Sequence, residues 1–253
     1  MSYTKAFGKV IKNEKIGTDI FDLVVKTPQA KAAEIGQFMQ ILIESKVLRR
    51  PISICEIDRA QDTLRMVYLI KGEGTKWLSK VKSGDTLDLL GPVGHGFSKG
   101  KNILVIGGGI GVPPLLQTAK EALSADAILG YKTKDYAVLT DDFEKCCDKV
   151  LIATDDGSLG THGFVTDILK EQIKLKKYDM VCTCGPIPML KAVSEICESA
   201  DIPCEVSLEE RMGCGVGACV GCVCKIKSDN EEGYRHLQVC KYGPVINSKE
   251  VLW

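Results

Sequence analysis

The chain has 253 residues, of which 45% are hydrophobic and 26% are charged, as is ordinary for a globular enzyme with two domains or one domain and a smaller module. Lysine plus arginine and aspartate plus glutamate both number 33, and this zero net charge argues against a nucleic-acid-binding protein or one held on a membrane by charge. Residues 1–17 lack the apolar core of a signal peptide, and no apolar run is long enough to span a membrane. Because 12 cysteines occur without a secretion signal, we expect a reducing compartment, the cytoplasm.

The first segment, residues 1–99, alternates apolar and polar residues in the manner of β-strands. Turn residues such as Thr27-Pro28 and Lys71-Gly72 separate most of the short apolar runs. A short helix is expected over 76–81, and strands are expected at 10–11, 21–25, 38–43, 52–54, 64–70 and 86–90. Strands of this length and number predict an antiparallel β-barrel.

The second segment, residues 100–209, has a different rhythm. Its apolar runs are continuous rather than alternating, which is typical of strands buried on both faces. They lie at 102–106, 127–131, 150–153, 180–183 and 204–208, with helices expected at 113–123, 163–176 and 187–200. Strand and helix in alternation predict an α/β domain with a parallel sheet covered on both faces.

Four motifs fall where strands of the second segment are expected to end: Gly107–Gly111, Asp155–Ser158, Cys184–Pro186 and Glu209-Glu210. Ligands of open α/β sheets bind at that edge, and a glycine turn before a helix lets backbone N–H groups meet a pyrophosphate. The turn GGGIG lacks the last glycine of the G-x-G-x-x-G pattern, so an ordinary tight turn between strand and helix is the alternative.

Two motifs of the first segment are suited to a phosphate or a flavin. Arg50-Pro51-Ile52-Ser53 offers a guanidinium and a hydroxyl on a strand edge. Gly74-Thr75 opens the expected helix, whose free N–H groups suit an anion. Ordinary barrel turns are the alternative interpretation of both motifs.

The third segment, residues 210–253, carries the most specific pattern. Its cysteines have the spacing C-x4-C-x2-C with a distant fourth, which is the ligand pattern of a plant-type [2Fe–2S] cluster; they are Cys214, Cys219, Cys222 and Cys240. Interspersed glycines permit a tight loop with N–H groups turned toward sulfur. The alternatives are zinc, which prefers two separated C-x2-C pairs, and disulfides, which need an oxidising compartment. Cys224 lies close enough in sequence to compete as a ligand, although we expect a buried, inert thiol there.

The motifs also occur in a characteristic order over essentially the whole chain: RPIS, GEGT, GPVGHGF at 91–97, GGGIGVPP, CGP and the cysteine loop. In this order the sequence resembles the ferredoxin–NADP reductase superfamily. Within that superfamily it is most similar to the electron-transfer subunits of dihydroorotate dehydrogenase B. The resemblance implies an α+β multidomain protein with an FAD-binding antiparallel β-barrel (1–99), an NAD-binding α/β domain (100–209) and a small C-terminal [2Fe–2S] module (210–253).

The resemblance also implies roles for particular residues. The flavin would be contacted by Arg50, Pro51, Ile52, Ser53, Val67, Tyr68, Leu69, Gly74 and Thr75, although relatives often carry a basic residue at the position of Leu69. NAD(H) would be held by Gly107, Gly108, Gly109, Gly111, Pro113, Cys184, Gly185 and Pro186. Cys184 and Glu209 would lie nearest the nicotinamide, but hydride transfer requires no acid or base and none is assigned. The cluster would be ligated by Cys214, Cys219, Cys222 and Cys240.

The implied function is electron transfer between an FMN-containing dihydroorotate dehydrogenase subunit and NAD⁺ in UMP biosynthesis, with two copies of each chain in a heterotetramer. Alone, the chain would act as an NADH diaphorase. The alternative within the superfamily is the small subunit of an NADH-dependent ferredoxin or sulfide oxidoreductase. In that group the first cluster ligand is typically aspartate, whereas this chain has Cys214. A zinc-stabilised interaction module is the alternative from a different class.

NAD(H) is expected over NADP(H), although Lys132 and Lys134 follow the second strand of the sheet, where a basic residue can accept a 2′-phosphate.

Overall fold

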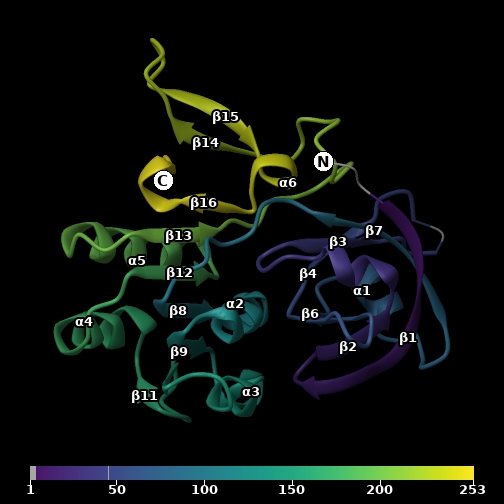
Figure 1. Ribbon diagram of the computed structural model, residues 1–253, viewed down its shortest axis with the longest axis horizontal. Helices are drawn as coiled ribbons and strands as arrows, with labels where there is room; N and C mark the ends of the chain where they lie inside the picture. Colours follow the sequence, from purple (N-terminus) through teal and green to yellow (C-terminus); the bar gives the residue numbers. More distant parts are fainter. Residues whose placement is uncertain (1–3, 45) are drawn as a thin grey trace.

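The first part of the chain forms a curled antiparallel sheet, seen in blue and purple in the computed structural model, which describes residues 4–44 and 46–253 (Figure 1). The strand order is β4-β3-β7-β1-β2-β6-β5. The bounds are β1 (Thr4–Gly17), β2 (Ile20–Lys26), β3 (Phe38–Ile41), β4 (Arg50–Ser53), β5 (Glu56–Asp58), β6 (Thr63–Leu69) and β7 (Thr86–Val93), with the 3-10 turn η1 (Pro28–Ala32) and the helix α1 (Glu73–Leu78).

Burial alternates along β7, as in a strand with one face in a core, whereas all four residues of β3 are buried. In β3, Met39 and Ile41 point into the core of the curled sheet, together with Leu87 and Leu89 of β7. The strand expected at 10–11 is in fact the 14-residue β1, which pairs with both β2 and β7. Exposed lysines interrupt its apolar pattern, so the sequence predicted only two of its residues as a strand. Strand β5 was not predicted, and α1 begins three residues before the helix predicted over 76–81.

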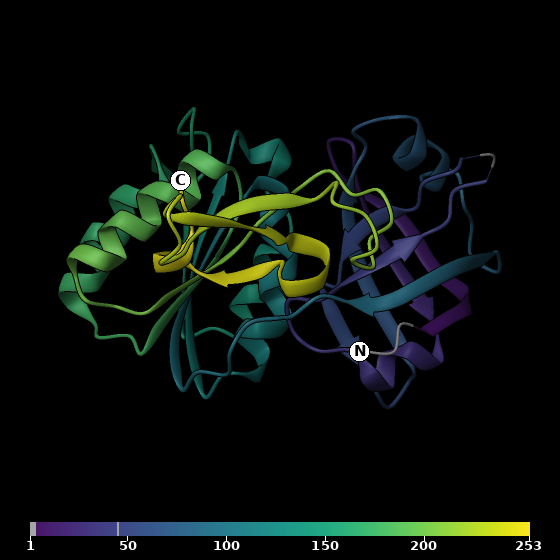
Figure 2. The ribbon, with the colours of Figure 1, turned by 90° about the horizontal axis from the view of Figure 1, so that it is seen from above.

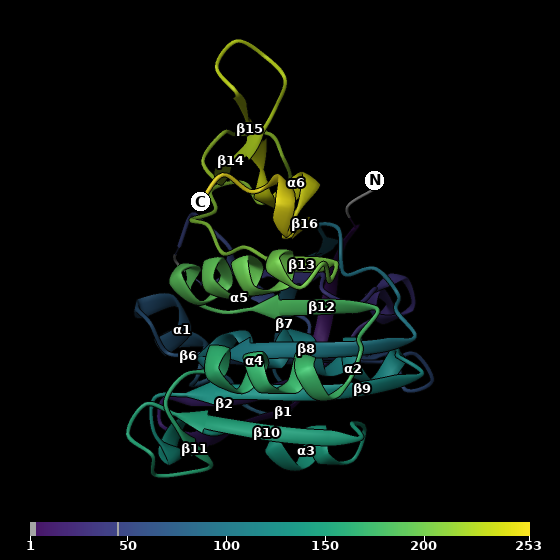
Figure 3. The same ribbon diagram turned by 90° about the vertical axis from the view of Figure 1, so that its left-hand side faces the viewer.

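The second part of the chain is a seven-stranded sheet in the order β11-β10-β9-β8-β12-β13-β16. Helices α4 and α5 cover one face, and α2 and α3 lie on the other (Figure 3). The strands are β8 (Asn102–Gly108), β9 (Ser124–Tyr131), β10 (Lys149–Thr154), β11 (Thr161–His162), β12 (Met180–Cys184) and β13 (Cys204–Ser207). The helices are α2 (Leu116–Glu121), α3 (Thr140–Glu144), α4 (Val165–Leu175) and α5 (Ile187–Ser199), with 3-10 turns η2 (Gly109–Gly111), η3 (Pro113–Leu115) and η4 (Lys134–Tyr136).

The parallel sheet covered on both faces is therefore confirmed. The helix predicted over 113–123 is shorter than expected and begins with η3. Pro113 and Pro114 explain this start, because proline fixes φ and has no N–H to donate within the first turn. Helix α3 was not predicted, whereas α4 and α5 lie within two residues of the helices expected at 163–176 and 187–200.

The last part of the chain lies over the seam between the two larger sheets (Figure 2). It consists of the hairpin β14 (Val223–Lys227) and β15 (Tyr234–Gln238), α6 (Val239–Tyr242), β16 (Val245–Asn247) and the turn η5 (Ser248–Glu250). The hairpin projects from the molecule, whereas β16 returns and pairs antiparallel with β13. Residues of the predicted cluster module thus complete the second sheet.

The multidomain α+β fold class is confirmed by these sheets, and the exact division at residues 99 and 209 stays a prediction. Residues 1–3 and 45 of the first predicted domain lie outside the described residues. Among the residues that the structure describes, no helix is long and apolar enough to cross a membrane.

Candidate functional site

The cysteine loop turns its backbone N–H groups toward sulfur, as a cluster-binding loop requires. The Cys214 sulfur accepts from the N–H groups of Val216, Ala218 and Cys219 at 3.4, 3.2 and 3.3 Å. Three further contacts reach the other sulfurs: Cys214 N–H to Cys219 at 3.5 Å, Gly217 N–H to Cys240 at 3.2 Å and Cys240 N–H to Cys222 at 3.4 Å. All four predicted ligands thus sit in one network.

The four thiols are arranged as two neighbouring pairs. The Cys214 N–H donates to the Cys219 sulfur, and the Cys240 N–H donates to the Cys222 sulfur, so each pair is linked through its backbone. Although burial opposes it, the backbone donors lower the pKa of Cys214 to about 6, whereas burial and the Cys222 thiol raise the pKa of Cys240 to about 12. Among the described residues, no three cysteine, histidine or carboxylate side chains are placed to hold a single metal ion, whereas two pairs of cysteines supply the four thiolates that the two irons of a [2Fe–2S] cluster take once it binds. These residues therefore fit the predicted [2Fe–2S] group.

Two glycines give the loop its shape. Gly215 and Gly217 have φ of 70° and 78°, in the left-handed region that side chains other than glycine adopt with difficulty. Cys224 lies apart from the network, because it is on β14 and its thiol donates to the carbonyl of Leu237 at 3.7 Å. Burial raises the pKa of Cys224 to about 11. Cys224 is therefore a protonated thiol at neutral pH, but it is half-buried rather than buried as predicted.

The predicted flavin motifs of the first sheet converge on one another. The Arg50 side chain packs directly on Gly74, where an added Cβ would lie 2.4 Å from Arg50 Nε. Thr75 caps α1 by accepting hydrogen bonds from the N–H groups of Lys71 and Gly72 at 2.9 and 3.3 Å. The structure thus brings the guanidinium of Arg50 to the start of a helix, where a phosphate finds both a cation and N–H donors.

Strand β6 divides its predicted flavin residues between two faces. Val67 and Leu69 pack against the apolar cluster shared with the second sheet. Tyr68 points into the core of the first sheet, where it donates to Asn13 at 3.0 Å and stacks on Phe21. Burial raises the pKa of Tyr68, so the phenol stays neutral. Only the backbone of Tyr68 remains for a flavin contact. Ile52 also faces the core of the first sheet, whereas Pro51 and Ser53 are half-buried on the other face of β4.

The two predicted nucleotide turns lie side by side at the ends of β8 and β12. Cys184 pairs with Gly107 in the parallel ladder. An added Cβ at Gly111 would lie 2.4 Å from the Cys184 carbonyl oxygen, and one at Gly108 would lie 2.6 Å from Met189 Sδ. These glycines are therefore required for close approach of two turns at the carboxyl edge of the sheet, where Gly109 and Cys184–Pro186 are accessible and the other predicted NAD residues are buried.

Cys184 and Glu209, predicted near the nicotinamide, differ in environment. Burial raises the pKa of Cys184 to about 12, so its thiol is protonated at neutral pH and is not a base. Glu209 follows β13 and is exposed, with Lys71 of the first sheet 3.2 Å away. Glu209 thus lies on the side of the second sheet that faces the predicted flavin domain.

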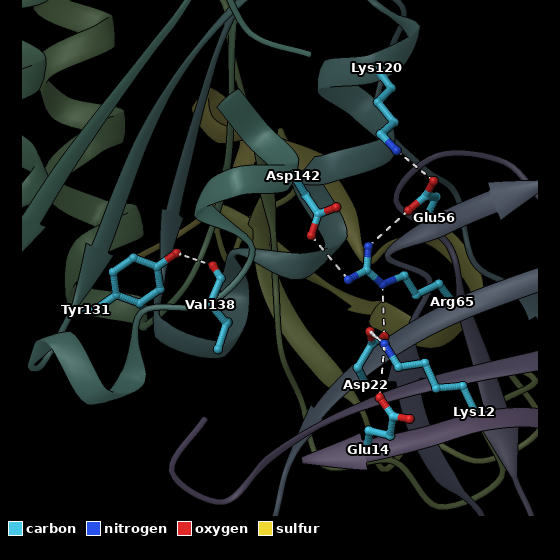
Figure 4. Close-up of polar contacts among 9 residues, drawn as sticks. All are labelled: Lys12, Glu14, Asp22, Glu56, Arg65, Lys120, Tyr131, Val138 and Asp142. Atoms are coloured by element: carbon cyan, nitrogen blue, oxygen red, sulfur yellow. Dashed lines mark hydrogen bonds and ion pairs between the residues drawn. The ribbon is translucent and has the colours of Figure 1, made fainter. Parts of the chain in front are cut away.

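An ion-pair network that the sequence analysis did not identify joins the two large sheets (Figure 4). Arg65 of β6 contacts Asp22 of β2 at 2.9 Å, Glu56 of β5 at 3.2 Å and Asp142 of α3 at 3.2 Å. Lys120 of α2 adds a 2.6 Å contact to Glu56. Burial opposes the charge of Arg65, but its hydrogen bonds to Asp22 and Asp142 raise its pKa above the usual range. The sequence did hold one signal for this network: Arg65 stands within the otherwise apolar strand predicted at 64–70, and a charged residue is rarely buried without partners.

Taken together, the curled antiparallel sheet, the parallel sheet and the cysteine loop define a flavoprotein reductase fold with an iron–sulfur module. Residues 209–252 match the model of the iron–sulfur cluster binding domain of dihydroorotate dehydrogenase B. The electron transfer subunit of dihydroorotate dehydrogenase B (NAD(+)) from Caldanaerobacter subterraneus is 38% identical over 252 residues, covering 98% of this chain and 99% of the relative. The subunit of that name from Fusobacterium nucleatum is 40% identical over 258 residues, covering 96% of both chains. The chain belongs to this family of electron-transfer oxidoreductase subunits.

Solved structures agree with this assignment. The structure of an NADH-dependent reduced ferredoxin-NADP oxidoreductase, studied for flavin-based electron bifurcation, matches with a TM-score of 0.87 at 31% identity. That match covers 98% of this chain and 90% of the other. A ferredoxin NADP⁺ reductase from Neisseria gonorrhoeae with bound FAD and NADP has a TM-score of 0.64 at 18% identity and covers 78% of this chain and 91% of its own. The second likeness shows the shared fold alone.

Proposed function

We propose that the chain carries electrons between NAD(H) and an FMN-containing dihydroorotate dehydrogenase subunit, by way of FAD and a [2Fe–2S] cluster. The observation that carries this proposal is the cysteine loop, in which six backbone N–H groups contact the sulfurs of the four cysteines. The same chain also carries the predicted flavin motifs and the predicted NAD motifs. The flavin supplies the exchange between the electron pair of a hydride and the single electrons that an iron–sulfur cluster takes.

The chain's own contribution is to bind and to orient. Arg50 and the start of α1 would hold the flavin phosphates, since the guanidinium already packs on Gly74. The joined turns at Gly107–Gly111 and Cys184–Pro186 would hold the dinucleotide against the sheet edge. Arg65 and its partners fix the angle between the two sheets, and with it the approach of nicotinamide to flavin. The sequence offers no pyrimidine site, so dihydroorotate itself would be oxidised on the partner.

The partner would be a separate chain in a heterotetramer with two copies of each, acting in UMP biosynthesis in the cytoplasm. The test is coexpression of this chain with the catalytic dihydroorotate dehydrogenase subunit of its own host. The copurified pair should reduce NAD⁺ with dihydroorotate, and this chain alone should reduce artificial acceptors with NADH but not oxidise dihydroorotate. Dihydroorotate oxidation by this chain alone would contradict the proposal.

A second candidate is the small subunit of a ferredoxin- or sulfide-linked oxidoreductase, favoured by the TM-score of 0.87 to the NADH-dependent ferredoxin-NADP oxidoreductase. Both candidates use the same cofactors, so they are separated by the partner. Copurification from the native host of a subunit that handles ferredoxin or sulfide would favour the second candidate and would leave the electron-transfer role of this chain intact.

A further inference from the structure

Gln40 of β3 occupies the seam between the predicted flavin strand and the cysteine loop. The antiparallel register places Gln40 directly opposite Pro51 of β4, and Phe38 opposite Ser53. Residues directly opposite in an antiparallel pair share a face of the sheet. Because Met39 and Ile41 point into the core of the first sheet, Gln40 and Pro51 point out of it, toward the C-terminal part of the chain.

The cysteine loop packs on this same face. An added Cβ at Gly215 would lie 1.9 Å from Gln40 Nε2 and 2.5 Å from its Cδ, so the loop backbone touches the carboxamide. Gln40 Nε2 also faces Met212 Sδ at 3.6 Å. Phe38, two residues earlier, belongs to the same apolar cluster as Cys222 and Cys240. Gln40 therefore lies between a predicted flavin residue on one side and the residue that follows a predicted cluster ligand on the other.

Gln40 has a buried Oε1 atom with no structural role within its own strand. Its side chain is completely buried, and within the described part of the chain its Oε1 atom has no hydrogen-bond partner. A buried acceptor without a donor is unfavourable, and a leucine of similar size would fill the space without that cost. The main chain of Gln40 is held separately, because its carbonyl accepts from Arg49 Nη1 at 3.3 Å. The carboxamide is thus bonded across the seam, where Nε2 donates to Met212 Sδ, rather than within the strand.

On the basis of the proposed function, we propose that Gln40 is a positioning residue for electron transfer between the two cofactors. Its carboxamide, which contacts Met212 and the backbone at Gly215, sets the distance and orientation of the cysteine loop relative to the flavin strand. Electron transfer between fixed centres depends steeply on their separation. A side chain that determines this separation therefore controls the rate without touching the nicotinamide.

The test compares Gln40→Leu with Gln172→Leu, a second buried glutamine that lies on α4 and contacts Lys149, away from both predicted sites. FAD and iron contents, the EPR spectrum of the dithionite-reduced cluster and the rates of flavin and cluster reduction after mixing with NADH are measured. We expect Gln40→Leu to keep wild-type flavin reduction, to alter the EPR spectrum, and to slow cluster reduction about 10-fold or more. Gln172→Leu should match the wild type in each measurement.

Gln40→Glu supplies the second variant, because it keeps the shape of the side chain and adds an ionisable group beside the loop. It should retain iron and, at a pH where the carboxyl is ionised, lower the midpoint potential of the cluster, which would show that side chain 40 lies beside the cluster. Wild-type EPR spectra, potentials and cluster-reduction rates in both Gln40 variants would overturn the inference alone. A wild-type chain that holds no flavin or no iron would overturn the proposed function as well.

Discussion

The first sheet has two seams with the rest of the chain, and they are built differently. Toward the second sheet, an apolar layer that includes Val67 and Leu116 is accompanied by the Arg65 ion-pair network. Toward the cysteine loop, Phe38 and Val93 belong to the same apolar cluster as Cys222 and Cys240, and the carboxamide of Gln40 touches the loop at Gly215. Apolar packing joins the loop to the first sheet, whereas charged side chains join the first sheet to the second beside an apolar layer.

The largest expected effect is at the cysteine loop. Cys219→Ser should remove the iron and leave FAD largely in place, because a ligand is lost while the first sheet is untouched. The matched control is Cys224→Ser, which changes a thiol that contacts Leu237 and not the loop. Iron and flavin analysis of the purified variants is the measurement. Full iron content in Cys219→Ser, or iron loss in the control, would refute the ligand assignment.

The apolar seam should be the more costly of the two to break. Phe38 is 3% exposed and packs in the cluster that contains Cys222 and Cys240. Phe38→Ala should destabilise the chain by about 3–4 kcal/mol, through lost burial and the cavity left behind. Urea unfolding of the variant and the wild type measures the difference, which should change little with added salt. A destabilisation below about 1 kcal/mol would show that the loop does not depend on this packing.

The charged seam should be weaker and sensitive to its partners. Arg65→Met should cost about 2–3 kcal/mol, because it leaves the carboxylate of Asp22, whose side chain is 1% exposed, with Lys12 alone. It should also slow flavin reduction by NADH, since the two sheets lose a fixed angle. Urea unfolding and stopped-flow absorbance measure these effects. Unchanged stability together with an unchanged rate would mean that the network is incidental.

The smallest effect is expected at the margin of the same seam. Lys99, whose side chain is 79% exposed, pairs with Glu121 at 3.3 Å. Lys99→Ala should change stability by less than about 0.5 kcal/mol, because exposed ion pairs are screened and entropically costly. Urea unfolding at low and at high salt checks this. A loss as large as that of Arg65→Met would show that the whole seam acts as one charged unit.

The parts predicted from the sequence are those whose signals are local. Continuous apolar runs predicted the strands of the second sheet, and the spacing of four cysteines predicted a loop in which their sulfurs gather. The short helix α3 and the hairpin β14–β15 were not predicted, because their few residues show no clear helical or strand periodicity of apolar residues. The roles of Arg65 and Gln40 depend on partners distant in the sequence, such as Asp142 and Gly215, and only the fold brings these together.

The most direct test of the account is an anaerobic titration of the purified chain with NADH, followed by absorbance and by EPR. The account predicts about one FAD and one [2Fe–2S] cluster per chain, bleaching of the flavin bands, and the EPR signal of a reduced cluster. NADPH should be less effective than NADH. A colourless protein that contains zinc in the cysteine loop would contradict the account, and so would a flavin that NADH reduces while the cluster stays oxidised.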